Sequence, residues 1–460
     1  MTFSSINPYN QRKLNTYRAD SIASIERKVK QADRAFADWS ALSLADRIVF
    51  LRKVGEYLTA NKQRYGELMT AEMGKTLREA ITEIEKCAIS CAFYADHAAA
   101  FLADQSIESS DGPAARSVIT YQPLGPVLAI MPWNFPFWQA MRFAIPGLLA
   151  GNVGLLKHAP NVPGCALAIE ETFRESGLPD GVFQTLLVDV PVVETLLKDR
   201  RVKAVTLTGS GRAGASVASI AGSQIKKSVL ELGGSDALIV LADANLEKAA
   251  EIAVKSRMQN AGQSCIAAKR FIVEKSVKKQ FTELVLQQIQ QIRQGDPMND
   301  ATTMGPMARL DLADNIERQY RETIAKGARL ITGSKGSAIQ RSGCNVQPIL
   351  LDKVKPGMAA FDEETFGPLA VIIEAKDESD AIRLANQSDF GLGSALWTQD
   401  MDKADRLARQ IQAGSVFING LMRSDARVPF GGIKTSGFGR ELSEAGIKEF
   451  VNVKTIWVER

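Results

Sequence analysis

The feature that most constrains the fold of this chain is a long alternation of short apolar runs with helical segments, which begins at Gly125. The runs are apolar on both faces, as strands are when helices cover both sides of a parallel sheet. The pattern therefore predicts an α/β protein. The expected strands are PVLAIMP, VGLLKHA, VFQTLLV, VKAVTLT and SVLEL in a first series, and ALIVL, RFIVE, LAVIIEA, SALWTQ and SVFING in a second.

The segments outside this alternation are different in pattern. Residues Ser24 to Ala103 repeat apolar side chains at three- and four-residue steps, which predicts helices, and Ser43 is suited to cap one of them. SVITYQP, at Ser117–Pro123, is typical of a strand. The final segment FVNVKTIWVER alternates like an edge strand, and we expect it to pair with Ser117–Pro123 or with another subunit. The adjacent glycines of ELGGSD, at Glu231–Asp236, suit a hinge between two α/β halves.

Composition and charge exclude several classes of protein. The 460 residues are 45% hydrophobic and 23% charged, and the net charge of +4 is spread along the chain, so we expect no nucleic-acid partner. The N-terminus lacks the apolar core of a signal, and polar residues and prolines interrupt the most apolar window, Gly125–Ala150, so we expect no membrane span. The 5 cysteines form no CxxC pair, which is typical of a cytoplasmic protein, and only 2 histidines are present, so we expect no metal site.

A glycine-rich turn follows the predicted strand VKAVTLT. Gly209, Gly211 and Gly214 match the pattern GxGxxG between a strand and a helix, a context in which the backbone approaches a pyrophosphate closely. No acidic residue ends a following strand about 20 residues on, as that fingerprint usually requires. On these residues alone, a dinucleotide site and a simple tight turn both remain open.

Four polar residues outside this turn are candidates for chemistry. Cys265 lies in NAGQSCIAAKR among small neighbours that leave the sulfur accessible, and turn amides or cofactor charge would favour its thiolate; the alternative is an inert thiol. Asn134 can donate to an oxyanion or simply form a turn. Glu231 can act as a base or remain a solvated acid, and Arg142, eight residues after Asn134, can hold an anion or face water. Together these groups suit aldehyde oxidation, which needs a nucleophile, an oxyanion donor, a hydride acceptor and a base for water.

Six ordered segments resemble the signature segments of the NAD(P)-dependent aldehyde dehydrogenase superfamily. They are MPWNFP, LTGSGRAG, LELGGSD, NAGQSCIAAKRF, EETFGPLAV and PFGGIKTSGFGRE, and with the flanking regions the resemblance covers nearly the whole chain. It implies a cofactor domain, a catalytic domain and a small β flap that forms homodimers or homotetramers. The corresponding boundaries are 1–104 with 124–232, 233–435, and 105–123 with 436–460.

The resemblance also implies roles for individual residues. Cys265 would be the nucleophile, Asn134 and the backbone N–H of Cys265 the oxyanion donors, Glu231 the base for deacylation, and Glu441 a second acid in a proton relay. NAD or NADP would be the cofactor. The residues implied in cofactor binding are Trp133, Lys157, Gly209, Ser210, Gly214, Leu232, Glu364 and Phe366.

Within the superfamily, the segments KHAP and SDAR resemble bacterial succinate-semialdehyde dehydrogenases. This implies that Arg142 and Ser424 bind the substrate carboxylate of succinate semialdehyde or a related ω-oxo acid. Gln259 occupies a position where many such enzymes have an arginine, and Pro160 one where many NAD-preferring members have a glutamate. A broad-specificity aldehyde dehydrogenase, a coenzyme A-acylating relative and a non-catalytic binding protein on the same scaffold remain as alternatives.

Overall fold

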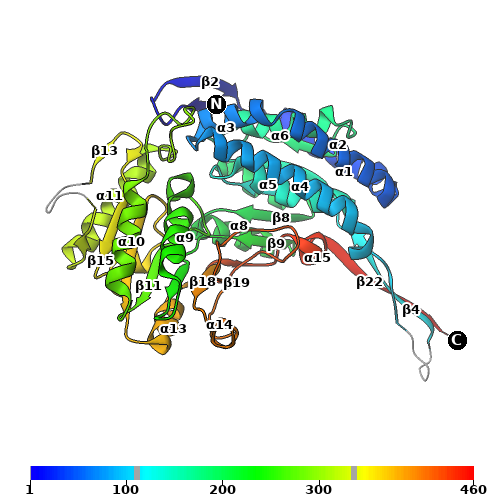
Figure 1. The fold of residues 1–460 in the computed structure, drawn as a ribbon. Coiled ribbons are helices and arrows are strands. Elements are labelled where there is room, and N and C mark those ends of the chain that lie inside the picture. The colour runs from blue at the N-terminus through cyan, green and yellow to red at the C-terminus, as the bar shows by residue number, and fades with distance from the viewer. Residues whose placement is uncertain (1, 108–113, 333–338, 460) are drawn as a thin grey trace.

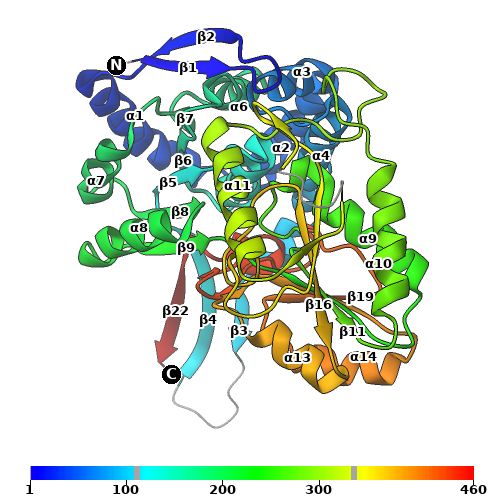
Figure 2. The same cartoon turned by 90° about the vertical axis from the view of Figure 1, so that its left-hand side faces the viewer.

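The computed structural model describes residues 2–107, 114–332 and 339–459. Two mixed α/β sheets form the body of the molecule, and a narrow antiparallel sheet projects from it with the C-terminus near its tip (Figure 1). The view in Figure 2 shows the same projection extending away from β8 and β9 of the first sheet. Among the described residues, no helix is both long and apolar enough to cross a membrane.

The first sheet has the strand order β21-β9-β8-β5-β6-β7, and all its neighbours are parallel except β21 with β9. The chain leaves β5 toward β6 on one side and later returns to β8 on the other. Side chains after β5 and β8 therefore meet at the point where the strand order reverses, the usual ligand crevice of such sheets. The strands are β5 (Pro126–Met131), β6 (Val153–His158), β7 (Phe183–Thr185), β8 (Ala204–Thr208), β9 (Lys227–Glu231) and β21 (Gly437–Phe438).

Helices cover both faces of this sheet, and their caps explain several of their starts. Ser43 accepts a hydrogen bond from the Asp46 N–H, as its position predicted, and Thr76 and Glu79 form a reciprocal capping box. The helices are α1 (Ile22–Ala41), α2 (Leu44–Ala60), α3 (Lys62–Met73), α4 (Leu77–Phe101), α5 (Pro136–Leu149), α6 (Pro163–Glu175), α7 (Val190–Lys198) and α8 (Gly211–Ser223).

The second sheet has the order β12-β15-β16-β11-β10-β18-β19 and is parallel except at β12. Its strands are β10 (Ala237–Val240), β11 (Arg270–Glu274), β12 (Arg329–Leu330), β15 (Ile349–Asp352), β16 (Leu369–Ala375), β18 (Gly393–Trp397) and β19 (Ser415–Ile418). Its helices are α9 (Leu246–Met258), α10 (Lys278–Gln290), α11 (Leu310–Ala325), α12 (Ala359–Asp362), α13 (Glu378–Asn386) and α14 (Met401–Ala408). The predicted α/β class is confirmed, although VFQTLLV is a strand only over Phe183–Thr185.

The projecting sheet has the order β22-β4-β3 and consists of β3 (Gln105–Ile107), β4 (Ala114–Pro123) and β22 (Val451–Glu459). β22 pairs antiparallel with β4, so the predicted pairing of the tail with Ser117–Pro123 is confirmed within one chain. Residues 108–113 of the predicted flap lie outside the described residues. Gly437–Phe438, which we assigned to the flap, pairs instead with β9 in the first sheet. The domain boundaries stay a prediction.

Smaller elements complete the described chain. The sequence analysis did not predict the N-terminal hairpin of β1 (Thr2–Ile6) and β2 (Lys13–Arg18), because its strands are mostly polar and exposed. The remaining elements are the short 3-10 helix η1 (Gln259–Gly262), β13 (Arg341–Ser342), β14 (Asn345–Val346), β17 (Phe390–Gly391), β20 (Ile433–Lys434) and α15 (Ser443–Ile447).

Candidate active site

A cavity of about 660 Å³ lies between α4, α5, the end of α9 and the loop 421–424. The sulfur-bearing residue Cys265 is part of its wall, as are Arg142 from α5 and Ser424 from the loop. The cavity therefore brings together three residues that the sequence analysis selected from distant segments. Its other polar lining residues include Arg78, Lys86, Lys255, Gln259 and Arg423.

The segment before Cys265 has an unusual backbone. α9 ends at Met258, and Asn260, Ala261 and Gly262 follow with positive φ angles of 51°, 52° and 75°. Such conformations cost roughly 1–2 kcal/mol for a residue with a Cβ, so the surroundings have to hold them. A Cβ at position 262 would lie 2.2 Å from the Gly367 carbonyl oxygen, which explains the glycine. α9 therefore stops at Met258, and the turn directs the next residues to the cavity.

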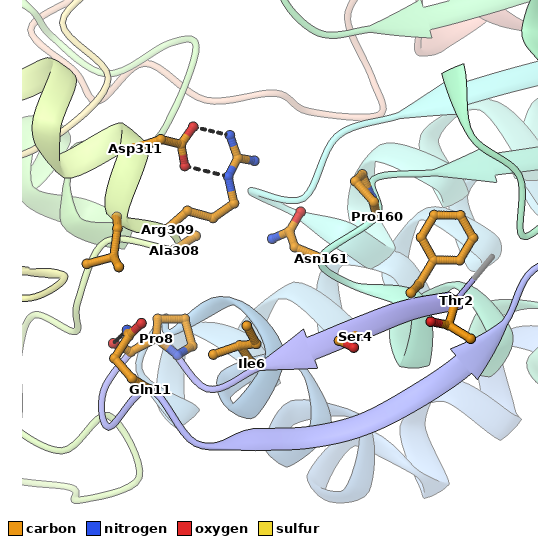
Figure 3. A pocket seen from close by; sticks show the side chains of 12 residues that line it. Thr2, Ser4, Ile6, Pro8, Gln11, Pro160, Asn161, Ala308, Arg309 and Asp311 are labelled. Atoms are coloured by element: carbon orange, nitrogen blue, oxygen red, sulfur yellow. Dashed lines mark hydrogen bonds and ion pairs between the residues drawn. The ribbon is translucent and has the colours of Figure 1, made fainter. Parts of the chain in front are cut away.

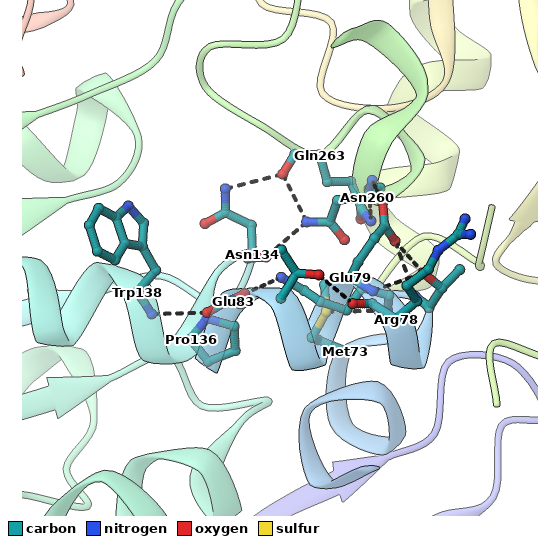
Figure 4. A network of polar contacts seen from close by, with 12 residues as sticks. Met73, Arg78, Glu79, Glu83, Asn134, Pro136, Trp138, Asn260 and Gln263 are labelled. Atoms are coloured by element: carbon teal, nitrogen blue, oxygen red, sulfur yellow. Dashed lines mark hydrogen bonds and ion pairs between the residues drawn. The ribbon is translucent and has the colours of Figure 1, made fainter. Parts of the chain in front are cut away.

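Asn134 is fixed against this turn by the polar network in Figure 4. Its Nδ2 donates to the Gln263 carbonyl oxygen at 3.1 Å, and its own carbonyl oxygen accepts from Asn260 Nδ2 at 2.8 Å. The Asn260 backbone N–H donates to Glu79 Oε1 at 2.8 Å, which connects the turn to α4. The side chain of Asn134 is buried, and its amide is anchored two residues before Cys265, as an oxyanion donor should be.

The Cys265 thiol is not activated by its surroundings alone. Burial raises its pKa to about 12, against the opposing effects of Arg142 and Lys269. The expectation was that turn amides or cofactor charge would favour the thiolate; the protein groups alone disfavour it, because burial outweighs both cations. Lys269 Nζ donates to the carbonyl oxygens of Ser264 at 2.9 Å and Cys265 at 2.6 Å, so it fixes the backbone of the residue that carries the sulfur. The backbone N–H of Cys265 itself donates no hydrogen bond to the described residues.

Two buried glutamates lie behind the cavity wall. Glu231, at the end of β9, is 2% exposed, and neither of its carboxylate oxygens has a hydrogen-bond partner among the described residues. Burial raises its pKa well above the ordinary value, and the nearby Glu441 raises it further. Its Oε1 would lie 2.8 Å from a Cβ on Gly431, so only glycine leaves room for this rotamer. The structure therefore points Glu231 at Gly431 rather than into the cavity.

Arg142 connects these acids to the cavity. It is 2% exposed, forms an ion pair with Glu441, and donates from Nη2 to Thr208 Oγ1 at 3.3 Å. Burial raises the pKa of Glu441, and Arg142 opposes that rise. The guanidinium also lies 4.6 Å from the ring centre of Phe430. Nη1 has no hydrogen-bond acceptor among the described residues, so only part of the guanidinium is committed to the protein.

The predicted substrate residue Ser424 has two neighbours that the sequence analysis did not identify. Its Oγ accepts from Lys86 Nζ at 2.7 Å and from Trp138 Nε1 at 3.1 Å. Lys86 lies on α4, 338 positions from Ser424, and no local motif marks it. Of the two arginines considered as replacements for the missing charge at Gln259, Arg423 lines the cavity, whereas Arg427 is bonded to Asp425 and does not.

The predicted cofactor residues surround the ends of β6, β8 and β9. Ser210 caps α8, a 13-residue helix whose first N–H groups are exposed and suit a pyrophosphate. Lys157, near the end of β6, is 7% exposed, and its side chain makes no hydrogen bond with the described residues, so its ammonium is free for a ribose or phosphate oxygen. A Cβ at Gly214 would lie 2.6 Å from Leu232, so this glycine allows α8 to pack closely. Gly209 has its N–H bonded to the Glu231 carbonyl.

Three further predicted cofactor residues lie near the join of the two α/β halves. Glu364 accepts from the Gly234 N–H at 3.1 Å and lies 3.5 Å from Lys269 Nζ, the same lysine that holds the Cys265 carbonyl. Trp133 and Phe366 pack edge to face with ring centres 5.8 Å apart. The donors and apolar walls that a nicotinamide dinucleotide needs are therefore present in this chain.

A second cavity, of about 400 Å³, lies beside Pro160 and under β1 (Figure 3). The side chain at position 160 is a proline and provides no carboxylate to this cavity. Arg309, on its wall, donates to Asp311 at 2.8 and 2.7 Å, so this positive charge is already neutralised. The surroundings of Pro160 therefore neither repel a 2′-phosphate nor offer a free arginine to bind one.

Comparisons with known proteins agree with this arrangement. The model of the aldehyde dehydrogenase family matches residues 1–456. The chain is 49% identical over 458 residues to a probable succinate-semialdehyde dehydrogenase (NADP+) of Synechocystis sp., covering 100% of both chains. It is 46% identical to the succinate semialdehyde dehydrogenase (NAD(P)+) Sad of Escherichia coli, covering 99% and 98% of the two chains. The structure of succinic semialdehyde dehydrogenase from Streptococcus pyogenes with NADP+ matches with a TM-score of 0.96 and 35% identity, covering 100% of both chains. This protein belongs to the aldehyde dehydrogenase family.

Proposed function

We propose that this chain oxidises succinate semialdehyde, or a related ω-oxo acid such as glutarate semialdehyde, to the carboxylic acid with NAD or NADP. One observation carries the proposal: a single cavity holds Cys265 together with cationic and hydroxyl groups from α4, α5 and the loop 421–424. A nucleophile and an anion-binding wall in one cavity suit an aldehyde that also bears a carboxylate. The names of the Synechocystis and Escherichia coli relatives support the same aldehyde and the same cofactors.

The first step is attack of the Cys265 sulfur on the aldehyde carbon, with loss of the thiol proton to a base. The carbonyl oxygen becomes an oxyanion, which Asn134 Nδ2 and the backbone N–H of Cys265 would bind. Asn134 keeps one of its two amide hydrogens for this purpose, because only the bond to Gln263 uses the other. The network to Asn260 and Glu79 holds the amide in place before the charge develops.

A bound NAD or NADP would supply the hydride acceptor, and loss of hydride from the tetrahedral carbon would leave a thioester on Cys265. Glu231 would then take a proton from water as the water attacks, the C–S bond breaks, and the acid leaves. Burial and Glu441 raise the pKa of Glu231, which makes it a stronger base than a solvated glutamate. In this role its side chain has to turn from Gly431 toward Cys265, while Glu441 would take up or return the proton behind it and the permanently charged Arg142 would stabilise the Glu441 carboxylate.

The cofactor would be held by this chain's own groups. Ser210 and the first turn of α8 would bind the pyrophosphate, Lys157 the adenosine ribose, and Glu364 the nicotinamide ribose. The remaining predicted contacts of the site are Trp133, Gly209, Gly214, Leu232 and Phe366 for the cofactor, and Arg142 and Ser424 for the substrate carboxylate. Pro160 leaves both NAD and NADP acceptable.

The test is kcat/KM for succinate semialdehyde, glutarate semialdehyde and butanal, each with NAD and with NADP. We expect the two semialdehydes to exceed butanal by at least about tenfold, because one charged hydrogen bond contributes about 1.5–3 kcal/mol. Equal values for butanal would contradict the proposed substrate. Product formation only on addition of coenzyme A would favour the acylating alternative, and no reduced cofactor from any aldehyde would contradict the enzyme assignment.

Two further parts of the proposal concern the cellular location and the oligomeric state of the enzyme. A cytoplasmic location is supported by the five cysteines, all of which are unpaired. A homodimer or homotetramer is supported by exposed apolar side chains on β22, among them Val453, Ile456 and Trp457. Light scattering of the purified chain gives its mass in solution, and a monomer would contradict the second part.

A further inference from the structure

Lys86 differs from the other cations of the active-site cavity. Arg78, Lys255 and Arg423 are exposed, and Arg142 is paired with Glu441. Lys86 is only half-buried by accessible area, yet no carboxylate of the described residues lies within ion-pair distance of it. It is therefore the one cavity-lining cation, among the described residues, that is neither solvated at the surface nor neutralised by the protein.

The surrounding acids are all committed elsewhere. Glu83, one helical turn before Lys86, is paired with Lys75 and accepts from the Trp138 backbone N–H at 2.9 Å (Figure 4). Glu79 is bonded to Thr76 and to the Asn260 N–H. Asp425 holds Arg427. Among the described residues, no acid is therefore left as a counter-ion for Lys86, although acids are close by in the sequence.

The groups around Lys86 have the arrangement of an anion site. Its Nζ lies 2.7 Å from Ser424 Oγ and 4.0 Å from the ring centre of Trp138. Ser424 Oγ accepts from both Lys86 and Trp138 Nε1, which uses both of its lone pairs. Its own O–H must then point to a third group, and no acceptor for it is found among the described residues. An ammonium and a hydroxyl hydrogen are thus both left to donate into the cavity.

We infer that Lys86 and Ser424 together bind the distal carboxylate of the semialdehyde, so that Lys86 is a specificity-determining residue of this enzyme. The inference rests on the proposed function, because it assigns a contact to the substrate proposed there. A carboxylate placed here would accept from the ammonium and from the Ser424 hydroxyl, and the Trp138 ring would exclude water from one side. Gln259, which also lines the cavity, contributes no charge, so Lys86 supplies the positive charge at this wall.

Burial supports this assignment independently of the contacts. It lowers the pKa of Lys86 to about 8, and the positive Arg142 lowers it further. A lysine in this state is destabilised as a cation until an anion comes close. A bound carboxylate would relieve that cost. Because no internal salt bridge competes for the ammonium, the ion pair with a charged ligand can contribute to the affinity of the site.

The experiment compares Lys86→Met, Lys86→Arg and Lys255→Met with the wild type, using succinate semialdehyde and butanal as substrates. We expect Lys86→Met to lower kcat/KM for the semialdehyde by about 10- to 100-fold and for butanal by less than about threefold. Lys86→Arg keeps the charge and should recover most of the loss. Lys255→Met removes a lysine from the exposed rim of the same cavity and should change neither substrate by more than about threefold.

Three results are decisive. Equal losses for both substrates in Lys86→Met would show a structural role and overturn the inference, and so would an unchanged semialdehyde value. A wild type that prefers butanal would overturn the proposed substrate instead, which separates the two failures. Thermal unfolding of Lys86→Met checks that the variant is folded, and Lys86→Arg keeps the test valid if it is not.

Discussion

The two charged walls of the active-site cavity are built in opposite ways. Around Arg142, the protein pairs its own charges. The guanidinium forms an ion pair with Glu441, and it lowers the pKa of the buried Glu231 against the opposing effect of burial. Around Lys86, the part of the chain that the structure describes provides no counter-ion for the ammonium and no acceptor for the Ser424 hydroxyl. In the first wall most of the charge is already paired without substrate, with Arg142 Nη1 left uncommitted among the described residues, and this wall suits the proton transfer that every aldehyde needs. The second wall is completed only by an anion, and it is where selection among aldehydes would occur.

Replacement of the nucleophile is the largest expected effect, because both walls serve the same sulfur. Cys265→Ala should reduce turnover below about a thousandth of the wild-type rate for every aldehyde, while cofactor binding persists. Steady-state assays and cofactor fluorescence measure the two properties. Cys91→Ala is a matched control, since Cys91 is fully buried in the core against Gly55 and should affect stability rather than chemistry. Substantial activity in Cys265→Ala would contradict the nucleophile assignment.

The wall of paired charges is tested next by Glu231→Gln. We expect an initial burst of reduced cofactor followed by steady turnover about 10²- to 10³-fold slower, because only deacylation loses its base. The raised pKa of Glu231 also sets the sign of the pH dependence: the wild-type steady rate falls as pH decreases through that pKa, and the variant lacks this fall. Rapid-mixing kinetics across pH measure both effects. An unchanged steady rate would place the base elsewhere.

Arg142→Met should show the difference between the two walls most clearly in the free energy of unfolding. It leaves the buried Glu441 without its cation, and loss of one partner of a buried pair costs on the order of 3–5 kcal/mol. Because Arg142 also contacts the cavity, activity should fall for butanal as well as for succinate semialdehyde, unlike in Lys86→Met. Denaturant unfolding and the two kcat/KM values provide the comparison. A stable variant that loses only the semialdehyde would make Arg142 a pure substrate anchor and the contrast between the walls wrong.

The smallest expected effect is a pH dependence of substrate preference. Lys86 faces Glu83 and Cys87 on its own helix, Arg142 on α5 and Asp425 on the loop, and the balance lowers its pKa to about 8. As pH rises through 8, Lys86 loses its proton, so kcat/KM for succinate semialdehyde should fall several-fold relative to butanal. The ratio cancels titrations of Cys265 and Glu231, which affect both substrates. A ratio that is constant from pH 7 to pH 9.5 would contradict a role for this ammonium.

The two walls also differ in how far the sequence could predict them. Cys265, Asn134 and Glu231 each lie at or shortly after the end of a strand or helix, within a distinctive short segment, so local signals and the resemblance to a family identify them. Lys86 is one polar residue on a long helix, and its partner Ser424 is 338 positions away, so no spacing rule marks it. The left-handed turn at Asn260 was missed for a related reason: its support comes from Glu79 on another helix. The β1–β2 hairpin was missed because exposed polar strands lack the apolar alternation that predicts strands.

The central claim is that the sulfur of Cys265 bonds covalently to the substrate carbon in a cavity that already contains the anion-binding wall. Intact-mass spectrometry of Glu231→Gln after mixing with succinate semialdehyde and cofactor tests it most directly. The account predicts a mass increase of one succinyl group, located by peptide mapping to the segment containing Cys265 and absent from the double variant with Cys265→Ala. Reduced cofactor produced without any adduct, or an adduct on another cysteine, would contradict it.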